Sequence, residues 1–327
     1  MVDLSTRYMG LPLRNPLIVA SCSLGKTAEG VRRCADAGAG AVVLKSLFEE
    51  QIYAETKDLE EYLWLSGHPE AFEYVRGFRM ELGPEQYVEF IEDAKKAVSI
   101  PIIASLNCIS PKWWATYAKR IERAGADALE LNISVMPSDP KRSSKEIETL
   151  YLDIFDGVKN QVDIPIAVKI GPYFTSLARM AWELGRRGAS ALVLFNRFYR
   201  FDIDIDKLEL ATGYQFSSPH EMNLSLRWIA LLAGRVNSDL AASTGVHDGA
   251  GVVKQLLAGA SAVQLCSTLY LNGLEQIRRI LQEVETWMRK HNFESVEQMR
   301  GKLSQMSSEK PELYERLQYV KALVGID

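Results

Sequence analysis

Two lysines stand near the ends of short apolar runs. If these runs are parallel strands, both lysines lie at the same edge of a sheet. Lys45 and Ser46 end the run AVVLKS, and Lys169 lies within the run IAVKI. A buried ammonium group is costly without a partner. We therefore expect both lysines to bind a common anionic ligand. The alternative is that each side chain extends past its strand end to solvent.

A second chemical signal follows the last two apolar runs. The segment STGVHDGAGVVKQLLAGA places glycines between a run and a helix, and Ser267 and Thr268 follow the final run. Backbone N–H groups in such loops and at helix N-termini bind phosphate. The position of this segment in the chain, more than its glycines, predicts a phosphate-bearing ligand. The alternative is a set of ordinary turn glycines.

Eight short apolar runs must position these side chains. Each run has five or six residues and is almost continuously apolar, as in parallel strands that are buried on both faces. Helical segments separate the runs, so the pattern predicts a parallel sheet with helical crossovers. The runs are residues 17–21, 41–46, 102–107, 128–133, 166–170, 191–196, 239–244 and 262–267.

Glycine and proline mark where many of these strands begin. Glycine precedes four runs, in GAGAVVLKS, GADALELNI, GASALVLFN and GASAVQLCS, and Ile-Pro precedes two others. Glycine past a helix end takes the left-handed conformation cheaply, and proline suits the first position of a strand. Eight such units in 327 residues favour a closed (β/α)8 TIM barrel, formed by residues 1–327 as one domain, over a doubly wound sheet.

Two connections in this pattern are long. Residues 47–90 and 197–225 leave the strand ends where barrel enzymes place active sites, and both contain aromatic and charged residues. They predict either lids over the active-site face or contacts between subunits. After the last run, apolar residues at 277, 280, 281, 284, 287 and 288 predict one face of a helix that packs back on the barrel.

Composition excludes several functional classes. The chain is 47% hydrophobic and 24% charged, with a net charge of −4 and no block of like charge, so we expect no nucleic-acid partner. Its four cysteines show no metal-ligand spacing. No apolar run approaches the roughly 20 residues of a membrane span, and the N-terminal residues do not resemble a signal peptide. We therefore expect a cytoplasmic protein with reduced thiols and no membrane partner.

Two enzyme classes fit these residues. One is an enzyme that binds flavin mononucleotide (FMN). The other is a flavin-free, aldolase-like barrel that uses a lysine as a Schiff base on a sugar phosphate.

The ordered segments NPLIVAS, GAVVLKS, ELNIS, PIAVKIGPYF and STGV…AGASAVQLCSTL resemble the dihydroorotate dehydrogenase family, in particular its soluble class 1 enzymes. The resemblance extends from NPLIVAS to MRGKL. It implies a (β/α)8 barrel that holds FMN and oxidises dihydroorotate to orotate in pyrimidine biosynthesis. Position by position, it implies a cofactor site of Ala20, Ser21, Lys45, Ser46, Ser105, Asn132, Lys169, Ser217, Ser218, Gly245, Val246, Cys266 and Ser267.

The same resemblance implies individual roles. Lys45 would contact the flavin and the substrate, and the charge of Lys169 would stabilise the anion formed at the pyrimidine edge of the flavin on reduction. Asn132 and Asn196 would hydrogen-bond the substrate. Gly245, Val246, Cys266 and Ser267 would bind the phosphate. Ser217 and Ser218 stand where the family has a glycine pair, which also lies near the phosphate.

One part of the family pattern is missing. The family has Asn-x-Ser-Cys-Pro-Asn, or serine for the cysteine, after the fourth strand, and that Cys or Ser takes a proton from the substrate carbon. Here Val135 and Pro137 occupy the positions of the base and the last asparagine. The family's asparagine in the loop after the second strand also has no clear match. A positioned base contributes about 10²–10⁴ in rate, so another group must substitute if the family reaction persists.

Three side chains are candidates for that substitute base. Cys108 is our catalytic candidate, because a nearby cation would lower the pKa of a thiol; the alternative is a buried small hydrophobe. Tyr173 and His68 are the others.

Arg197 departs from the family as well, since it replaces a small residue. It predicts either bidentate binding of a substrate carboxylate or a salt bridge to Asp202 or Asp204.

The sequence thus predicts an FMN-dependent oxidoreductase of CH–CH bonds, with dihydroorotate as substrate. The alternatives are an FMN oxidoreductase for a different cyclic or unsaturated carbonyl compound, a flavoprotein that binds ligand without turnover, and the aldolase-like barrel. The resemblance implies a homodimer and leaves an iron–sulfur partner subunit open. The N-terminal helical extension of the membrane-bound class is absent from this sequence, so we do not expect direct docking of quinone.

Overall fold

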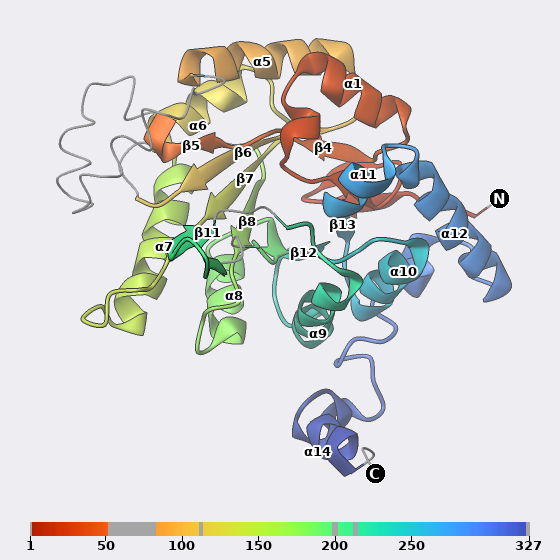
Figure 1. Cartoon of the computed structure of the whole chain (residues 1–327). Coiled ribbons are helices and arrows are strands. Elements are labelled where there is room, and N and C mark those ends of the chain that lie inside the picture. The colour runs from red at the N-terminus through yellow and green to blue at the C-terminus, as the bar shows by residue number, and fades with distance from the viewer. Residues whose placement is uncertain (1, 52–82, 111–113, 198–201, 212–214, 325–327) are drawn as a thin grey trace.

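The computed structural model describes residues 2–51, 83–110, 114–197, 202–211 and 215–324 (Figure 1). Within these ranges, eight parallel strands form one sheet that closes on itself, because β4 pairs with both β3 and β6. The predicted (β/α)8 barrel is therefore confirmed. In barrel order the strands are β3 (Leu17–Val19), β4 (Ala41–Val43), β6 (Ile102–Cys108), β7 (Ala128–Ile133), β8 (Ile166–Ile170), β9 (Ala191–Leu194), β12 (Asp239–Ser243) and β13 (Ala262–Leu265). A short strand, β5 (Leu47–Phe48), adds to the edge of β6.

Helices cover the outside of the barrel (Figure 1). Apolar residues of α12 at 277, 280, 284 and 288 are buried, which confirms the predicted packing face after the last strand. The helices in the described ranges are α1 (Ala28–Asp36), α5 (Pro84–Ala97), α6 (Trp114–Arg123), α7 (Ser144–Lys159), α8 (Leu177–Arg186), α9 (Met222–Leu232), α10 (Gly249–Ala258), α11 (Ser267–Asn272), α12 (Gln276–Lys290), α13 (Val296–Met299) and α14 (Arg316–Val324). None of them is long and apolar enough to cross a membrane.

The junction glycines act as the sequence predicts. Gly38, Gly125, Gly188 and Gly259 all have positive φ, between +90° and +121°. In each case the left-handed residue ends a helical segment and turns the chain into the next strand. At Gly259 a side chain is also excluded by space, because a Cβ would lie 2.4 Å from the Cβ of Ala233.

An N-terminal hairpin, which the sequence pattern did not predict, fills one end of the barrel. It consists of β1 (Thr6–Tyr8) and β2 (Leu11–Leu13), joined at Met9 and Gly10. Thr6 Oγ1 donates to the carbonyl of Ser261, and Met9 N–H donates to Asp239, so the hairpin lies at the N-terminal ends of the strands. Its apolar side chains pack against inward-facing alanines of six strands: Ala41, Ala128, Ala167, Ala191, Ala241 and Ala262.

The two long connections are shorter than the sequence suggested. In the first, β5 follows β4 closely and α5 already begins at Pro84, while residues 52–82 lie outside the described residues. In the second, β10 (Asp202–Asp204) and β11 (Glu209–Ala211) form an antiparallel hairpin. A 3₁₀ turn, η2 (Pro219–Glu221), leads into α9 at Met222. Residues 84–90 thus belong to α5, and Pro84 stands at its first position, where proline suits the first turn of a helix.

Candidate active site

A lysine, two asparagines and buried hydroxyls meet at the C-terminal ends of the strands. In the sheet register Asn132 stands opposite Lys169 on one side and Asn107 on the other. The Oδ1 atom of Asn132 is buried and accepts no hydrogen bond from the described residues. Such an atom costs about 1–3 kcal/mol if nothing binds it. The register therefore places a cation beside an amide oxygen that a ligand donor can satisfy.

Lys169 is buried inside the barrel beside an acidic partner. Its Nζ donates to Gln264 Oε1 at 3.0 Å and lies 3.7 Å from Glu130 Oε1. Gln264 Nε2 in turn donates to the other oxygen of Glu130. Glu130 is 1% exposed, and its Oε1 accepts no hydrogen bond in the described part of the chain. Lys169 is thus held in place by its neighbours and does not extend to solvent.

Hydroxyl groups from three adjacent strands form a continuous chain. Ser46 Oγ lies 2.9 Å from Ser21 Oγ and 2.8 Å from Ser105 Oγ, and Ser46 N–H also donates to Ser21 Oγ. Ser105 is fully buried, and its backbone N–H donates to the hydroxyl of Tyr87. Ala20, which precedes this chain, is buried and donates its N–H to the carbonyl of Leu265. The structure therefore brings together four residues of the predicted cofactor site.

A second group of predicted residues meets beyond β12 and β13. Ser217 N–H donates to Ser267 Oγ at 3.0 Å, and Gly245 N–H lies 3.3 Å from Ser217 Oγ. His247 Nε2 lies 3.4 Å from the same hydroxyl. We call Ser217, Gly245, His247 and Ser267 the hydroxyl cluster. Gly245 has φ +78°, and a Cβ there would lie 2.3 Å from the backbone nitrogen of Met222, so this turn requires glycine.

Other predicted cofactor residues lie at the edge of these groups. Ser218 caps the turn before α9, with its N–H donating to Glu221 at 2.8 Å. Val246 is buried. Lys45 is half-buried, and its backbone N–H donates to the carbonyl of Gly25. Cys266 is half-buried and directly precedes α11.

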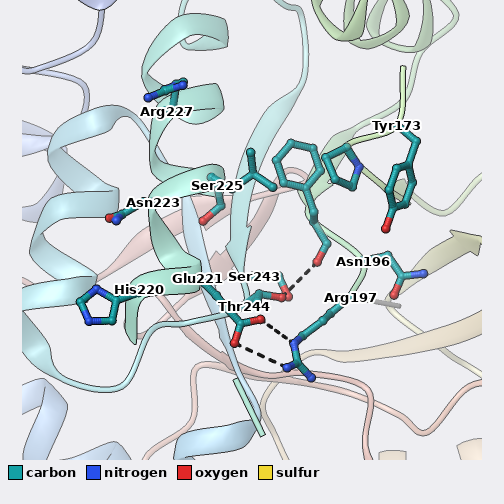
Figure 2. A pocket seen from close by; sticks show the side chains of 13 residues that line it. Tyr173, Asn196, Arg197, His220, Glu221, Asn223, Ser225, Arg227, Ser243 and Thr244 are labelled. Carbon is teal, nitrogen blue, oxygen red and sulfur yellow. Dashed lines mark hydrogen bonds and ion pairs between the residues drawn. The ribbon is translucent and has the colours of Figure 1, made fainter. Parts of the chain in front are cut away.

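A cavity of about 490 Å³ opens beside these groups, at the ends of β8, β9 and β12. Its lining includes Tyr173, Asn196 and Thr244. Figure 2 shows Tyr173 and Asn196 on one side of the pocket, and His220 and Asn223 on the side of α9. Thr244 Oγ1 donates to the carbonyl of Phe195 at 3.4 Å. This hydrogen bond links the segment after β12 to the segment after β9. The predicted substrate residue Asn196 therefore lines a space large enough for a small molecule.

Arg197 is held by an acid that the sequence analysis did not foresee. Its Nε donates to Glu221 at 2.8 Å (Figure 2). Its Nη1 donates to the carbonyl of Gln215. The predicted salt bridge to Asp202 or Asp204 is wrong, because the hairpin β10–β11 points those residues elsewhere: Asp202 bonds its neighbour Ile203, and Asp204 pairs with Lys207. A carboxylate ligand at Arg197 would have to compete with Glu221.

The loop after β7 carries an apolar group where the family has its base. Val135 is half-buried and packs against the core, while Met136 and Pro137 are exposed. Tyr151, on α7, lies edge-on against Phe174, with ring centroids 5.0 Å apart. Of the candidate substitute bases, Tyr173 is 56% exposed at the pocket. Cys108 ends β6 with its side chain outside the described residues, and His68 lies outside them entirely.

Several buried polar residues of this region were missed from the sequence. Glu49 is fully buried and accepts hydrogen bonds from Ile109 N, Ser110 N and Trp114 Nε1 at 2.8–3.0 Å, which fixes the loop after Cys108. Glu130 and Gln264 were interpreted only as parts of apolar strands. For Glu130 a signal existed, because residues two apart on a strand share a face, and Asn132 was already a candidate.

The fold and these groups define an α/β-barrel enzyme site at the C-terminal face, with a buried cation and a buried amide directed at a ligand. A sequence model of the dihydroorotate dehydrogenase family matches residues 71–288, so the chain belongs to this family. Membership implies a flavin cofactor. The unsatisfied Asn132 Oδ1 next to Lys169 fits a heteroaromatic ring that carries both a hydrogen-bond donor and a region of developing negative charge.

Curated relatives agree with the family match over most of the chain. The chain is similar to "Dihydroorotate dehydrogenase B (NAD(+)), catalytic subunit" of Methanothermobacter thermautotrophicus, with 29% identity over 91% of this chain and 97% of the relative. Proteins of the same description from Pyrococcus furiosus (28% identity, 92% and 98% coverage) and Thermoplasma acidophilum (26% identity, 92% and 99% coverage) are also similar.

Proposed function

We propose that this chain binds FMN at the C-terminal face of the barrel and oxidises the CH–CH bond of dihydroorotate, or of a closely related cyclic carbonyl compound. The observation that carries the proposal is the buried pair of Lys169 and Asn132, opposite each other in the register, with Asn132 Oδ1 unsatisfied. Family membership supplies the reaction class, and this pair supplies a place where the ring of the cofactor fits.

Residues of this chain would hold the cofactor from two sides. Lys169, kept in place by Gln264 and Glu130, would face the pyrimidine edge of the ring, and Ser46 and Ser105 would lie along it. The hydroxyl cluster would bind the phosphate, because it gathers hydroxyls and backbone N–H groups from three segments of the chain. FMN, when bound, supplies a two-electron acceptor for the hydride that leaves the substrate.

The substrate would lie between Asn132 and Asn196, with Lys45 at its anionic side. Val135 can neither accept nor donate a proton, so the proton from the substrate carbon must go to another group. We propose Cys108, because it ends β6 directly after Asn107, which stands opposite Asn132, and the loop that follows it is fixed by Glu49.

A second candidate substrate class has an observation in its favour. Val135 packs against the core and Arg197 already pairs with Glu221, so the loops that contact the substrate differ from those of the family. A cyclic or unsaturated carbonyl compound whose oxidation needs no strong base at this position would fit such a pocket.

The first experiment is an anaerobic visible spectrum of the purified protein, before and after addition of dihydroorotate. The proposal expects a flavin spectrum that loses its absorbance when dihydroorotate is added. A flavin spectrum that stays oxidised would reject dihydroorotate and favour the second substrate class. A protein that is colourless and takes up no FMN would reject the flavin proposal, and borohydride trapping of a substrate on Lys169 would then identify aldolase-like chemistry.

The role of Cys108 is tested by Cys108→Ser, with Cys34→Ser as the matched control. Cys34 is fully buried in α1 and lies outside the site. The proposal expects slower flavin reduction in Cys108→Ser, with the flavin still bound, and no change in the control. Equal rates in the two variants would remove Cys108 as the proton acceptor.

We also propose that residues 1–327 act as one domain in a homodimer in the cytoplasm, with a further electron-transfer subunit as the natural acceptor. The names of the relatives support a further subunit, since they describe catalytic subunits. Light scattering of the pure chain, and of a complex isolated through a tag on this chain, tests both points. A monomeric chain with which no iron–sulfur protein co-purifies would reject both the homodimer and the further subunit.

A further inference from the structure

A second cavity, of about 780 Å³, lies on the outside of the barrel between α9, α10 and the C-terminal segment of residues 303–322. We call it the outer cavity. Its volume is in the range of small-molecule sites in proteins. Asn223 and Arg227 of α9 line both this cavity and the one at the strand ends. Figure 2 shows their side chains pointing away from Tyr173 and Asn196, so the outer cavity lies across α9 from the candidate active site.

The walls of the outer cavity are largely apolar. Leu226 and Leu231 come from α9, Leu257 comes from α10, and the C-terminal segment contributes Leu303 and Tyr319. Leu303 is 57% exposed and Tyr319 is 63% exposed, although both are large hydrophobic side chains. A ligand that filled this space would remove their surface from water, which is the main favourable term in most association. The walls therefore favour a ligand with an apolar body.

Hydrogen bonds attach the C-terminal wall to the two helices. Leu303 N–H donates to the carbonyl of Leu257 on α10 at 2.8 Å. Gln305 N–H donates to the carbonyl of Ala230 on α9, also at 2.8 Å. The Gln305 side chain is buried, and its Nε2 donates to Glu315 Oε1 at 2.8 Å. The wall that carries Leu303 is therefore fixed against both helices (Figure 1).

Two cations of the lining have no acidic partner. Arg227 of α9 and Lys254 of α10 are exposed, and neither makes a hydrogen bond or an ion pair with any residue that the structure describes. Glu315 also lines the cavity, but its carboxylate already accepts the hydrogen bond from Gln305. Arginine and lysine bind carboxylates through charge-assisted hydrogen bonds. Apolar walls beside two available cations are therefore complementary to an anionic group on an apolar body.

We propose that the outer cavity binds one free long-chain carboxylate, with its chain against Leu257 and Leu303 and its head group at Arg227 and Lys254. The inference does not depend on the proposed function. A concave cavity between α9, α10 and the C-terminal segment suits a single small molecule better than a flat membrane surface. A second copy seated here in a symmetric contact would add two further cations to the same face, so the charges favour an anion as occupant.

The test measures binding to the purified full chain, without detergent, by isothermal titration calorimetry. The probes are octanoate, decanoate and laurate below their micelle concentrations, with 1-decanol as the neutral match of decanoate. The proposal expects one molecule per chain and an affinity that rises about fourfold with each added methylene group. It also expects 1-decanol to bind about tenfold more weakly than decanoate. Binding that does not saturate at one molecule per chain, or equal affinities for decanoate and 1-decanol, would overturn the proposal.

Charge variants locate the head group. Lys254→Gln and Arg227→Gln should each weaken decanoate binding about tenfold and leave 1-decanol binding unchanged, because they remove a charge and keep the walls. Lys290→Gln is the matched control, since Lys290 is exposed at the end of α12 and does not line the cavity. An equal loss of decanoate affinity in Lys290→Gln would show that general electrostatic attraction, and not this cavity, binds the anion.

A wall variant locates the chain. Leu303→Glu adds an acid to the apolar wall, so it should abolish decanoate binding. Leu303 is largely exposed, and this variant should therefore keep the thermal unfolding midpoint of the wild type. Decanoate that binds to Leu303→Glu with the wild-type affinity would exclude the outer cavity as its site.

Two other occupants of this face would give different results. If a second copy covers it, light scattering shows a dimer that Leu303→Glu dissociates, and decanoate does not bind to the wild-type chain. If an anionic membrane covers it, the chain sediments with phosphatidylglycerol vesicles, Lys254→Gln releases it, and free decanoate again does not bind. Either result would reject the carboxylate site.

Discussion

The interior of the barrel has two halves of opposite character. At the N-terminal end of the strands, alanines from six strands surround the hairpin side chains Tyr8, Met9 and Leu13. At the C-terminal end, the inward positions carry Ser105, Glu130, Asn132, Lys169 and Gln264, all polar or charged. The same strands therefore build an apolar half and a polar half within the length of a few residues.

The difference shows which half is complete by itself. Small side chains in the apolar half leave a volume that the hairpin fills, and among the described residues of this half the buried atom without a hydrogen-bond partner is the hydroxyl of Tyr8. In the polar half, Asn132 Oδ1 and Glu130 Oε1 have no hydrogen-bond donor among the described residues. Buried polar atoms are normally satisfied, so the cofactor proposed above would have to supply the donor that Asn132 Oδ1 lacks.

The largest expected effect comes from restoring a base to the polar half. Val135→Cys places a thiol at the position of the family base. Because a positioned base contributes about 10²–10⁴ in rate, we expect Val135→Cys, made in the Cys108→Ser background that removes the proposed acceptor, to accelerate flavin reduction by dihydroorotate by that order, measured by anaerobic stopped-flow. Val135→Ala is the control and should give no acceleration. An unchanged rate in Val135→Cys would show that the polar half differs from the family in more than its base.

The next effect concerns the buried pair. Lys169→Met removes the cation 3.7 Å from Glu130 and leaves a buried acid without its partner. Loss of one partner of a buried pair costs about 3–5 kcal/mol, and we expect the free energy of unfolding in urea to fall by this order. Adding Glu130→Gln to Lys169→Met should restore part of the lost free energy of unfolding. A double variant no more stable than Lys169→Met would show that the two residues do not interact.

Two glycines with nearly equal φ distinguish the halves. Gly10 (φ +77°) has nothing within 4 Å of the point where a Cβ would lie, whereas at Gly245 (φ +78°) a Cβ would meet the backbone of Met222. Gly10→Ala should lower the free energy of unfolding by about 1–2 kcal/mol, because only the left-handed conformation disfavours alanine there. Gly245→Ala should cost roughly 3 kcal/mol or more, because the backbone must also move. Equal losses in thermal unfolding would contradict the close approach at Gly245.

The smallest effect tests the apolar half. The hydroxyl of Tyr8 is buried and has no partner among the described residues, and burial, with Glu130 and Asp239, raises its pKa well above the ordinary value. Tyr8→Phe keeps the ring and removes the unsatisfied group, so we expect a gain of about 1 kcal/mol in unfolding free energy. A loss of stability would mean that the hydroxyl does have a partner, such as a buried water, and that the apolar half is not purely apolar.

Much of the fold could be predicted because local patterns determine it. The runs 128–133 and 166–170 are strands over those same residues, and the junction glycines end helical segments as expected. The hairpin at Thr6–Leu13 was missed because its strands are three residues long, too short for a period to show. Its place is determined by distant partners such as Asp239 and Ser261.

The site was less predictable, because its contacts also join residues that lie far apart in the chain. The resemblance gave Lys169 and Asn132, but the contact of Lys169 with Glu130 and Gln264 depends on which side of the strands faces inward and on the closure of the sheet. For Arg197 the sequence predicts either a substrate carboxylate or a nearby acid as partner, whereas its partner in the structure is Glu221, just before α9. Contacts between segments far apart in the chain leave no local pattern.

The hairpin also has a consequence for biosynthesis. Its residues are translated first, yet its hydrogen-bond partners Asp239 and Ser261 lie 230 and 255 positions later in the chain. Until the ribosome has produced β12 and β13, Tyr8, Met9 and Leu13 have no place to pack. A chain released early would expose these apolar side chains, as incomplete folding intermediates do. Burial of the hairpin thus marks a chain that has been synthesised through its last strand.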